Sequence, residues 1–369
     1  MKKHIVFFIG TTAEYIKMFP VIENIKQNNI PYKIIASGQN EISLTDIAKE
    51  TNLKIDLQLS DEKSIVKNAF GLFSWWLKTL PKGIKLIKST FVDVDLKRSI
   101  MVVHGDTIST TLGAITAKLL GMKSAHVEAG LRSKHLLTPF PEEIDRLVTS
   151  KIATYHFAPG LKPFNELPER YNKINTEFNT LVDALEYSKN IPCKDENILN
   201  ILNDDYCVFV CHRQENLMQH ALVRQVVDSA INVSKRKKVV FIMHQITENT
   251  LKSLDLYASL EKEPQVVIMG RVEYFDFMKL LSNAQFVITD GGSNQEELSY
   301  LGVPTLIIRK FTEREEGLEK NVILSKGNID MIEQFIQNYN DFKHNESTSE
   351  ISPSKLISDK LCFELNGGK

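Results

Sequence analysis

The sequence has no long hydrophobic run, no excess of either charge and few cysteines. No stretch approaches the roughly 18 to 20 apolar residues that cross a bilayer as a helix, so no membrane-spanning helix is predicted. The 45 Lys and Arg residues balance the 46 Asp and Glu residues, which argues against a nucleic-acid partner. The four cysteines have neither C-x-x-C spacing nor the density of a disulfide scaffold, which predicts reduced thiols and a cytoplasmic protein: Cys193, Cys207, Cys211 and Cys362.

The glycine fingerprint of dinucleotide-binding proteins is also missing. The first apolar run, His4–Ile9, is followed by GTTAE and not by G-x-G-x-x-G, so we do not expect NAD chemistry. A helix that begins after Gly10 would still present free backbone amides to an anion. Lys17 lies one turn into this helix, where it either reaches a phosphate or stays solvated.

A strand, helix, strand pattern stands out near the middle of the N-terminal half. The apolar runs Ile100–Val103 and Ser124–Val127 flank a helical pattern, and each run ends in a polar cluster. In a parallel sheet such clusters lie at the carboxyl edge, where ligands bind. Crowded carboxylates beside cations separate acid and base roles near neutral pH. We therefore expect three acids to converge on one pocket: Asp106, Glu128 and Glu142.

Two of these acids have a structural alternative. Asp106 is placed to cap a helix that begins near Thr107. Glu142 or Glu143 is placed to begin a helix at Glu142–Ser150, where acids favour the helix dipole. The conjunction of acids at consecutive strand ends favours a functional role.

Further β-branched runs alternate with helical patterns along the chain, which predicts an α/β protein. We expect two doubly wound Rossmann-like domains that face a central cleft, at residues 1–170 and 171–345, with a hinge in the polar and irregular residues 160–205. Residues 346–369 are expected to form a linker and a C-terminal helix that packs back on the protein. The other predicted strands are Tyr32–Ala36, Thr154–Pro159, Tyr206–Cys211, Lys238–Met243, Gln265–Met269, Phe286–Thr289 and Pro304–Ile308.

Polar groups follow every strand of the second half, among them His212 and His244. Gly291, Gly292 and Ser293 form a glycine turn before a predicted helix, and the free amides of such a turn bind phosphate. With Arg314 and His212 as further cations, the expected ligand is a diphosphate.

Residues 67–91 are apolar and basic, with Trp75 and Trp76 adjacent. One interpretation is a core or subunit-interface helix that is broken at Pro81. The other is a weak association with an acidic membrane surface, as amphipathic basic helices make.

Together these motifs resemble those of the non-hydrolysing UDP-N-acetylglucosamine 2-epimerases, whose architecture is similar to that of GT-B glycosyltransferases. The resemblance covers most of the chain. It implies that C2 of a UDP-sugar is inverted by elimination and re-addition of UDP, without a cofactor or metal. It further implies a role in surface polysaccharide synthesis, a homodimer, and a C-terminal helix that crosses to the first domain. The motifs are GTTAEYIKMFPVI, HGDT, HVEAGLRS, PFPEEIDR, HRQEN, GGSNQEE and TEREE.

The resemblance also implies roles for single residues. The matching catalytic positions are Asp106, Glu128, Glu142 and His212. The resemblance also implies that Phe277 stacks on the base. To the implied substrate-binding positions we add His244, Gly292 and Ser293, which follow strands predicted in the second half. The substrate-binding set is Lys17, Gln39, Arg146, His244, Phe277, Gly292, Ser293, Glu297 and Arg314.

The sequence departs from the family pattern in two phosphate-binding motifs. Thr12 and Ala13 replace the arginine and proline of GTRPE, and DSGG is DGGS at Asp290–Ser293. Asn40 stands where a histidine usually follows the glutamine, and Phe178 where a glycine usually precedes Asn179.

Three other activities share this pattern. A GT-B glycosyltransferase would pass the sugar of a UDP-sugar to an acceptor, for example a lipid-linked one. A hydrolysing 2-epimerase would release the free sugar and UDP. A UDP-sugar sensor would bind without turnover.

Overall fold

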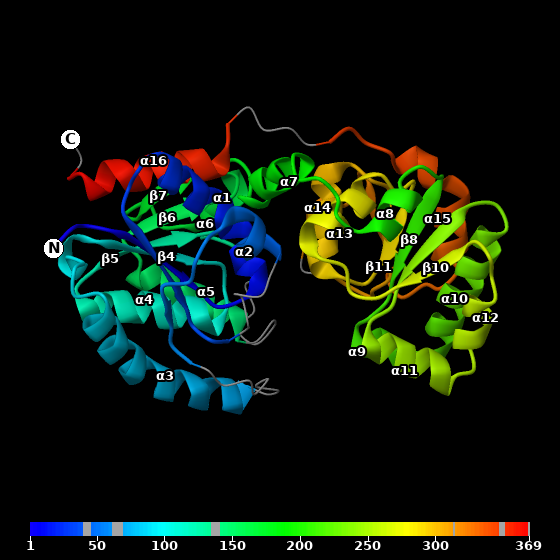
Figure 1. Ribbon diagram of the computed structural model, residues 1–369, viewed down its shortest axis with the longest axis horizontal. Coiled ribbons are helices and arrows are strands. Elements are labelled where there is room, and N and C mark those ends of the chain that lie inside the picture. The colour runs from blue at the N-terminus through cyan, green and yellow to red at the C-terminus, as the bar shows by residue number, and fades with distance from the viewer. Residues whose placement is uncertain (40–45, 61–68, 134–140, 313, 347–350, 368–369) are drawn as a thin grey trace. The chain divides into compact units, whose positions relative to one another are not determined.

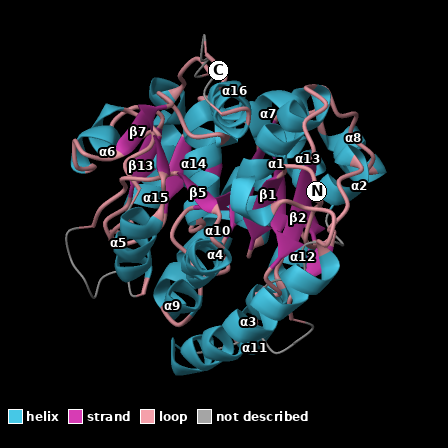
Figure 2. Cartoon of the chain, turned by 90° about the vertical axis from the view of Figure 1, so that its left-hand side faces the viewer, coloured by secondary structure: helices cyan, strands magenta, loops and turns pink. Residues whose placement is uncertain are grey.

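The computed structural model describes residues 1–39, 46–60, 69–133, 141–312, 314–346 and 351–367, so Asn40 lies outside the described residues. The chain forms two compact units. Unit 1 comprises Met1–Ala184 and Ser349–Lys369, and unit 2 comprises Leu185–Thr348. In each unit helices cover a parallel sheet (Figure 1), and Figure 2 shows the strands enclosed by helices.

Unit 1 contains a parallel sheet with the strand order β3-β2-β1-β4-β5-β6-β7. β1 pairs with both β2 and β4, so the strand order reverses between β1 and β4. Every residue of β1 and β4 is buried, as expected for central strands covered on both faces. The elements are β1 (Ile5–Ile9), α1 (Thr12–Gln27), β2 (Tyr32–Ala36), α2 (Asp46–Thr51), β3 (Leu57–Gln58), α3 (Ala69–Thr90), β4 (Ile100–His104), α4 (Ile108–Leu120), β5 (Lys123–Val127), α5 (Glu142–Ile152), β6 (Tyr155–Ala158), α6 (Leu161–Glu166), β7 (Asn172–Asn175), α7 (Leu181–Lys189) and α16 (Pro353–Leu365).

Unit 2 repeats this arrangement with the strand order β10-β9-β8-β11-β12-β13. Here β8 pairs with both β9 and β11, so the reversal lies between β8 and β11. The elements are α8 (Glu196–Ile201), β8 (Tyr206–Val210), α9 (Gln214–Leu217), α10 (His220–Ser234), β9 (Lys238–Ile242), α11 (Gln245–Ser253), α12 (Tyr257–Glu261), β10 (Val266–Met269), α13 (Tyr274–Ser282), β11 (Val287–Thr289), α14 (Gly292–Leu301), β12 (Thr305–Ile307), β13 (Val322–Leu324) and α15 (Met331–Asn338).

Each strand predicted from the sequence is present, but residues 160–205 are not irregular. They contain α6, β7 and α8, and α7 crosses from unit 1 to unit 2. β7 was not predicted from the sequence. It lies at the edge of the described sheet, paired with β6, and its residues are half-buried or exposed. Such a strand contains no apolar run. Unit 1 extends past residue 170 because β7 belongs to its sheet.

The predicted break at Pro81 is also wrong, because α3 continues through this proline. Trp75 on one side of Pro81 and Ile87 on the other pack into the same hydrophobic core. This shared burial holds both halves in one helix, although a proline removes one helical hydrogen bond.

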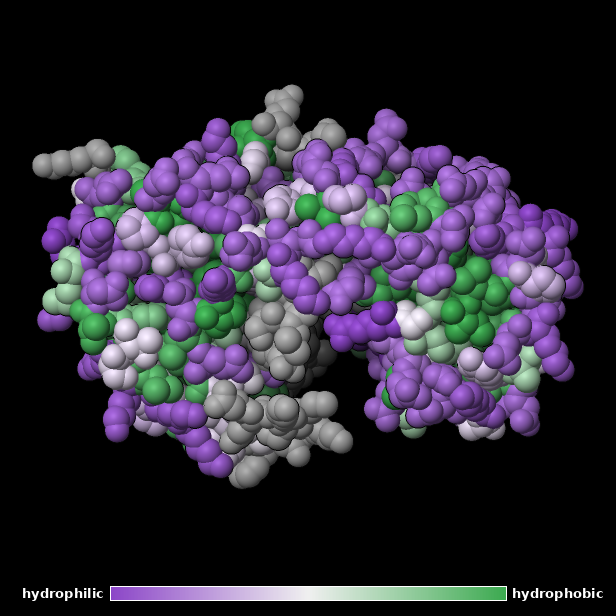
Figure 3. Space-filling view, in the orientation of Figure 1, coloured by the Kyte–Doolittle hydropathy of each residue, from purple (hydrophilic) through white to green (hydrophobic). Residues whose placement is uncertain are grey.

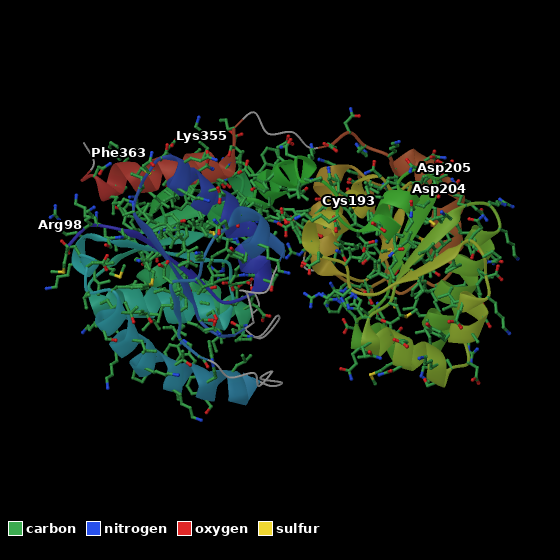
Figure 4. The ribbon with its side chains drawn as sticks, viewed as in Figure 1. Arg98, Cys193, Asp204, Asp205, Lys355 and Phe363 are labelled. Atoms are coloured by element: carbon green, nitrogen blue, oxygen red, sulfur yellow. The ribbon has the colours of Figure 1, made fainter. Side chains whose placement is uncertain are left out.

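The C-terminal helix α16 packs against α1 in unit 1. Lys3 Nζ donates to the Leu365 carbonyl at 3.0 Å, and the Tyr155 hydroxyl donates to Glu364 Oε2 at 2.6 Å. Lys355 and Phe363 point away from the unit (Figure 4). The helix therefore has one buried face and one exposed face.

Hydrophilic residues cover most of the face drawn in Figure 3, with hydrophobic residues in small patches. In the described part of the chain, no helix combines the length and apolar composition that crossing a membrane requires.

Candidate active site

Glu14 joins the loops that follow β1 and β4 in unit 1. It lies in the first turn of α1, and its Oε2 accepts a hydrogen bond from the Gly10 amide at 2.7 Å. Its Oε1 accepts a hydrogen bond from the Thr107 hydroxyl at 2.6 Å. Open α/β sheets bind ligands where the strand order reverses, so Glu14 shapes the expected ligand site. The sequence predicted free backbone amides at the start of this helix, but the Gly10 amide already donates to Glu14 Oε2.

Asp106 pairs with α5 and does not cap α4. Thr107 is the N-cap, in a reciprocal capping box with Thr110. Asp106 Oδ2 accepts hydrogen bonds from Arg146, at 2.9 Å from Nε and also from Nη2. The capping alternative for Asp106 is therefore wrong, and its carboxylate is held by a charge-assisted pair.

The two consecutive glutamates of α5 differ in their partners. Glu143 is fully buried and accepts hydrogen bonds from Arg132 Nε at 2.6 Å and the Ser133 amide at 2.9 Å. Burial raises the pKa of Glu143, but Ser133, Arg132 and Arg146 together hold it below its usual value. Glu142 begins α5, and its buried Oε2 has no hydrogen-bond partner within the described residues.

Glu128 follows β5 in a left-handed conformation, with φ of 66°. Lys17 Nζ lies 2.8 Å from its Oε1, and the Asn179 amide donates to the same oxygen. His104 Nε2 lies 3.6 Å from Oε2. A non-glycine residue in this conformation is strained, and such strain is concentrated at functional sites.

Gln39 adjoins these loops through a hydroxyl of α4. Ser109 Oγ donates to Gln39 Oε1 at 2.6 Å and lies 2.8 Å from Ser37 Oγ. A Cβ on Gly10 would lie 2.3 Å from Ser109 Cβ, so this approach of loop and helix requires glycine.

We call the charged residues of this edge the carboxylate cluster. One member, Glu14, was not predicted from the sequence, and it is buried like a core residue. Glu14 lies three residues before Lys17 on α1, and this spacing was a signal that the two share a helix face. Burial raises the pKa of Glu14 to about 7 against the opposing hydrogen bonds of Thr107 and Gly10. The members are Glu14, Lys17, Asp106, Glu128, Glu142 and Arg146.

Asp290 plays the equivalent part in unit 2, at the reversal between β8 and β11. It is fully buried, and both its carboxylate oxygens accept from the His212 amide, at 3.0 and 3.1 Å. The amide of Arg213 and the side chain of Asn216 donate to Oδ2 at 2.9 and 3.2 Å. The loops after β8 and β11 are thereby fixed to each other.

Three arginines surround Gly292 at the start of α14. A Cβ on Gly292 would lie 3.4 Å from Arg213 Nη2, 3.6 Å from Arg314 Nε and 3.9 Å from Arg309 Nη1. Arg314 is also paired with Glu296, which is buried in α14. Guanidinium groups at a helix N-terminus form an anion site.

Arg213 and Arg309 were missing from the predicted site. Their signal was their place directly after predicted strands, shared with the predicted residue His212. We call the group the arginine–histidine cluster, which comprises His212, Arg213, His244, Gly292, Arg309 and Arg314.

The two histidines of this cluster lie together. Their ring centroids are 4.7 Å apart, and His212 Nδ1 lies 3.1 Å from Asp290 Oδ1. Burial lowers the pKa of His244, with His212 and Arg271 acting in the same direction and Asp290 opposing them.

The remaining predicted residues of unit 2 lie on two helices. Ser293 is exposed in the first turn of α14, and Glu297 Oε2 accepts a hydrogen bond from Asn294 at 3.2 Å. Phe277 is half-buried on α13. No hydrogen bond, ion pair or ring contact within the described residues joins Phe277 to the arginine–histidine cluster.

Within the described residues, no group of three or more His, Cys, Asp or Glu side chains is arranged to hold a metal ion. Both clusters combine cationic or imidazole side chains with carboxylates, which accept hydrogen bonds. They suit an anionic ligand and proton transfer.

Comparisons with known proteins point to one family. Residues 23–355 match the family model described as UDP-N-acetylglucosamine 2-epimerase. The UDP-N-acetylglucosamine 2-epimerase of Methanocaldococcus jannaschii is 33% identical over 324 residues, which are 84% of this chain and 85% of that protein.

Solved structures agree in fold. The M. jannaschii UDP-GlcNAc 2-epimerase in complex with UDP-GlcNAc and UDP has a TM-score of 0.75 and 29% identity, covering 98% of this chain and 100% of that chain. MurG of Acinetobacter baumannii is similar in fold alone, with a TM-score of 0.58 and 12% identity over 98% of this chain and 99% of that chain. The predicted fold class, α/β with two doubly wound units of GT-B-like type, is confirmed.

Proposed function

We propose, since this chain belongs to the UDP-N-acetylglucosamine 2-epimerase family, that it interconverts UDP-N-acetylglucosamine, or a modified relative, and the manno epimer. The observation that carries this proposal is the pair of clusters at the two strand reversals. Unit 1 supplies carboxylates for proton transfer, and unit 2 supplies cations for a diphosphate. Neither cluster alone accounts for a reaction that both breaks a phosphate ester and moves a proton.

The reaction begins with departure of UDP from C1. The C1–O bond breaks, and UDP leaves with the electron pair while positive charge develops on the sugar ring. Carboxylates stabilise such an oxocarbenium-like centre, as in glycoside hydrolysis. Asp106 and Glu128 suit this task because each forms an ion pair with a cation, Arg146 and Lys17 respectively, which holds its carboxyl group in place.

Loss of the C2 proton to a carboxylate then gives the 2-acetamidoglucal. In the return direction a proton is added to C2 from the opposite face, and UDP attacks C1 again, so the cycle is balanced. We assign an acid and base role to Glu142, whose buried Oε2 lacks a partner in the described chain and is available to exchange a proton.

The arginine–histidine cluster receives the leaving UDP. The first amides of α14 and the guanidinium groups of Arg213, Arg309 and Arg314 offset the charge that develops on the diphosphate. The His212 backbone amide donates to Asp290, and the imidazole Nδ1 lies 3.1 Å from Asp290 Oδ1. We assign the other ring nitrogen, Nε2, to the ligand. Lys17, Gln39, His244, Phe277, Ser293 and Glu297 complete the proposed substrate-binding set.

The product assay separates this activity from its alternatives. We expect proton NMR of UDP-N-acetylglucosamine with the purified protein to show UDP-N-acetylmannosamine. Free N-acetylmannosamine with UDP would support the hydrolysing form. Binding of UDP without either product would contradict the proposal and favour a glycosyltransferase or a sensor.

We further propose a cytoplasmic homodimer that serves surface polysaccharide synthesis. Light scattering tests the dimer, because a protomer of 42.0 kDa would give twice that mass.

A weak association of residues 67–91 with acidic membranes is a separate proposal. Within its described part, α3 exposes Phe73 and Leu77 and four lysines, with no acid along Ala69–Thr90. Flotation with anionic vesicles is expected to carry the protein upward at low salt. Absence from the vesicle fraction would contradict the proposal. The lysines are Lys78, Lys82, Lys85 and Lys88.

A further inference from the structure

Asp145 is a buried acid beside the carboxylate cluster that the proposed reaction does not use. On α5, residues three and four apart share a face, which places Asp145 and Arg146 on the same side as Glu142. α5 packs on α4, where Thr111 Oγ1 donates to Asp145 Oδ1 at 2.6 Å. Asp145 is 6% exposed, and its Oδ2 is buried without a hydrogen-bond partner in the described chain.

No cation compensates this carboxyl group within the described residues. The neighbouring Arg146 donates to Asp106 and Glu143. The charged groups that act on Asp145 are Asp106 and Glu142, and both are acids.

The other described elements around Asp145 place no unpaired charge beside it. The lysine of α4, Lys118, is exposed and lies about two turns beyond Thr111. On β5, burial lowers the pKa of His126 to about 3, so this histidine is neutral. Among the described residues, the other charged side chains near α5 are Glu143, Lys151 and Arg132. Glu143 and Arg132 pair with each other, and Lys151 is exposed.

Burial therefore dominates the titration of Asp145. It raises the pKa of Asp145 to about 7, with the Thr111 hydrogen bond opposing it and Asp106 and Glu142 adding to it. A buried carboxyl group that has two acids as neighbours and no paired cation favours its protonated form.

We propose that Asp145 is a positioning residue of the carboxylate cluster, which holds a proton against α4 and so keeps additional negative charge away from Asp106 and Glu142. This inference rests on the proposed function. When Asp145 ionises above about pH 7, it adds an uncompensated negative charge beside the acid and base groups of the cluster. Asp145 then defines an alkaline limb of the activity profile without touching the substrate.

Two substitutions test the proposal through the pH profile of kcat. Asp145→Asn keeps the shape and removes the titration, so the loss of turnover above about pH 7 is expected to disappear. The ratio of kcat at pH 8.5 to kcat at pH 6.5 is expected to rise at least about tenfold over that of the wild type, because the protonated fraction of a group with a pKa of about 7 falls more than tenfold between these pH values. An unchanged ratio would overturn the proposal.

Thr111→Val provides the matched variant. It removes the hydrogen bond that favours ionised Asp145, so the alkaline limb is expected to move to higher pH. In the double variant with Asp145→Asn this displacement is expected to vanish. A purely structural role would lower kcat at all pH values in proportion, and that result would overturn the proposal.

A titration that needs no activity separates this inference from the proposed function. In protein labelled with ¹³C at the Asp carboxyl, one resonance is expected to titrate near pH 7 and to be missing from Asp145→Asn. A wild-type protein without epimerase activity would contradict the proposed function, while this titration would still decide whether Asp145 holds a proton. Titration of every Asp near the usual pH of about 4 would overturn the inference.

Discussion

Lys17 Nζ lies 2.8 Å from Glu128 Oε1, and this ion pair joins α1 to the residue that follows β5. Both side chains are largely buried, with 9% and 10% exposed. Breaking a buried pair by removing one partner leaves an uncompensated charge, which is far more damaging than loss of a surface pair. Glu128 is also one of the non-glycine residues with a left-handed backbone conformation.

Replacing Lys17 by Met is expected to lower turnover at least about 100-fold, because Glu128 loses the ion pair that positions its carboxylate. The control is Lys26→Met on the same helix, where the lysine is 42% exposed. Initial rates at saturating substrate measure the effect. Equal turnover in Lys17→Met and Lys26→Met would refute a catalytic role for the pair.

Replacing Arg213 or Arg309 by Gln is expected to weaken UDP binding by about 10- to 100-fold. Each variant removes a charge-assisted hydrogen bond of about 1.5–3 kcal/mol at the start of α14. Arg224→Gln is the control, since Arg224 is exposed on α10. Isothermal titration calorimetry with UDP gives the dissociation constants. An arginine whose loss leaves the constant unchanged does not bind the diphosphate.

Stability is expected to decrease as the pH rises from about 4.5 to 7, because burial raises the pKa of Glu14 to about 7 in the folded state. Between these pH values the folded state still binds a proton that the unfolded state has released. Raising the pH therefore shifts the equilibrium toward the unfolded state. The full effect of this shift is on the order of 3 kcal/mol.

Glu14→Gln should remove the part of that dependence that Glu14 contributes, and the part that comes from Asp145, whose pKa burial also raises to about 7, should remain. The amide oxygen of the variant still accepts from Gly10. Urea denaturation at pH 5 and pH 8 compares the two proteins. The idea fails if the wild type and the variant lose the same free energy of unfolding between these pH values.

Replacing Leu361 by Ala in α16 is expected to lower the free energy of unfolding by about 2–5 kcal/mol, because this side chain is fully buried. Phe363→Ala, two residues away and 46% exposed, serves as the control and should cost much less. Thermal denaturation measures both. If Leu361→Ala lowers the free energy of unfolding as little as Phe363→Ala does, α16 contributes little to the stability of unit 1.

The sheets were predictable because parallel strands covered on both faces are continuous apolar runs, as Ile5–Ile9 illustrates. The edge strand β7 lacks such a run, and only its pairing with β6 reveals it. Similarly, Pro81 marks a helix break by local preference, but packing of Trp75 and Ile87 overrides that preference.

The candidate site was predictable where chemistry follows a strand. The sequence places Asp106 after Ile100–Val103, and the structure pairs it with the predicted residue Arg146. Glu14 and Asp145 were not predictable in this way, because their importance comes from burial between helices and loops. Thr107, rather than Asp106, caps α4 because its hydroxyl completes a reciprocal pair with Thr110.

The most direct test of the account is proton exchange at C2 of the sugar. UDP-N-acetylglucosamine is incubated with the wild-type protein in deuterated buffer, and the C2 and anomeric signals are followed by proton NMR. The proposed mechanism requires that deuterium enters C2 as the signals of UDP-N-acetylmannosamine appear, and that Glu142→Gln slows both. A C2 proton that is fully retained, in a protein that still binds UDP-N-acetylglucosamine, would contradict it.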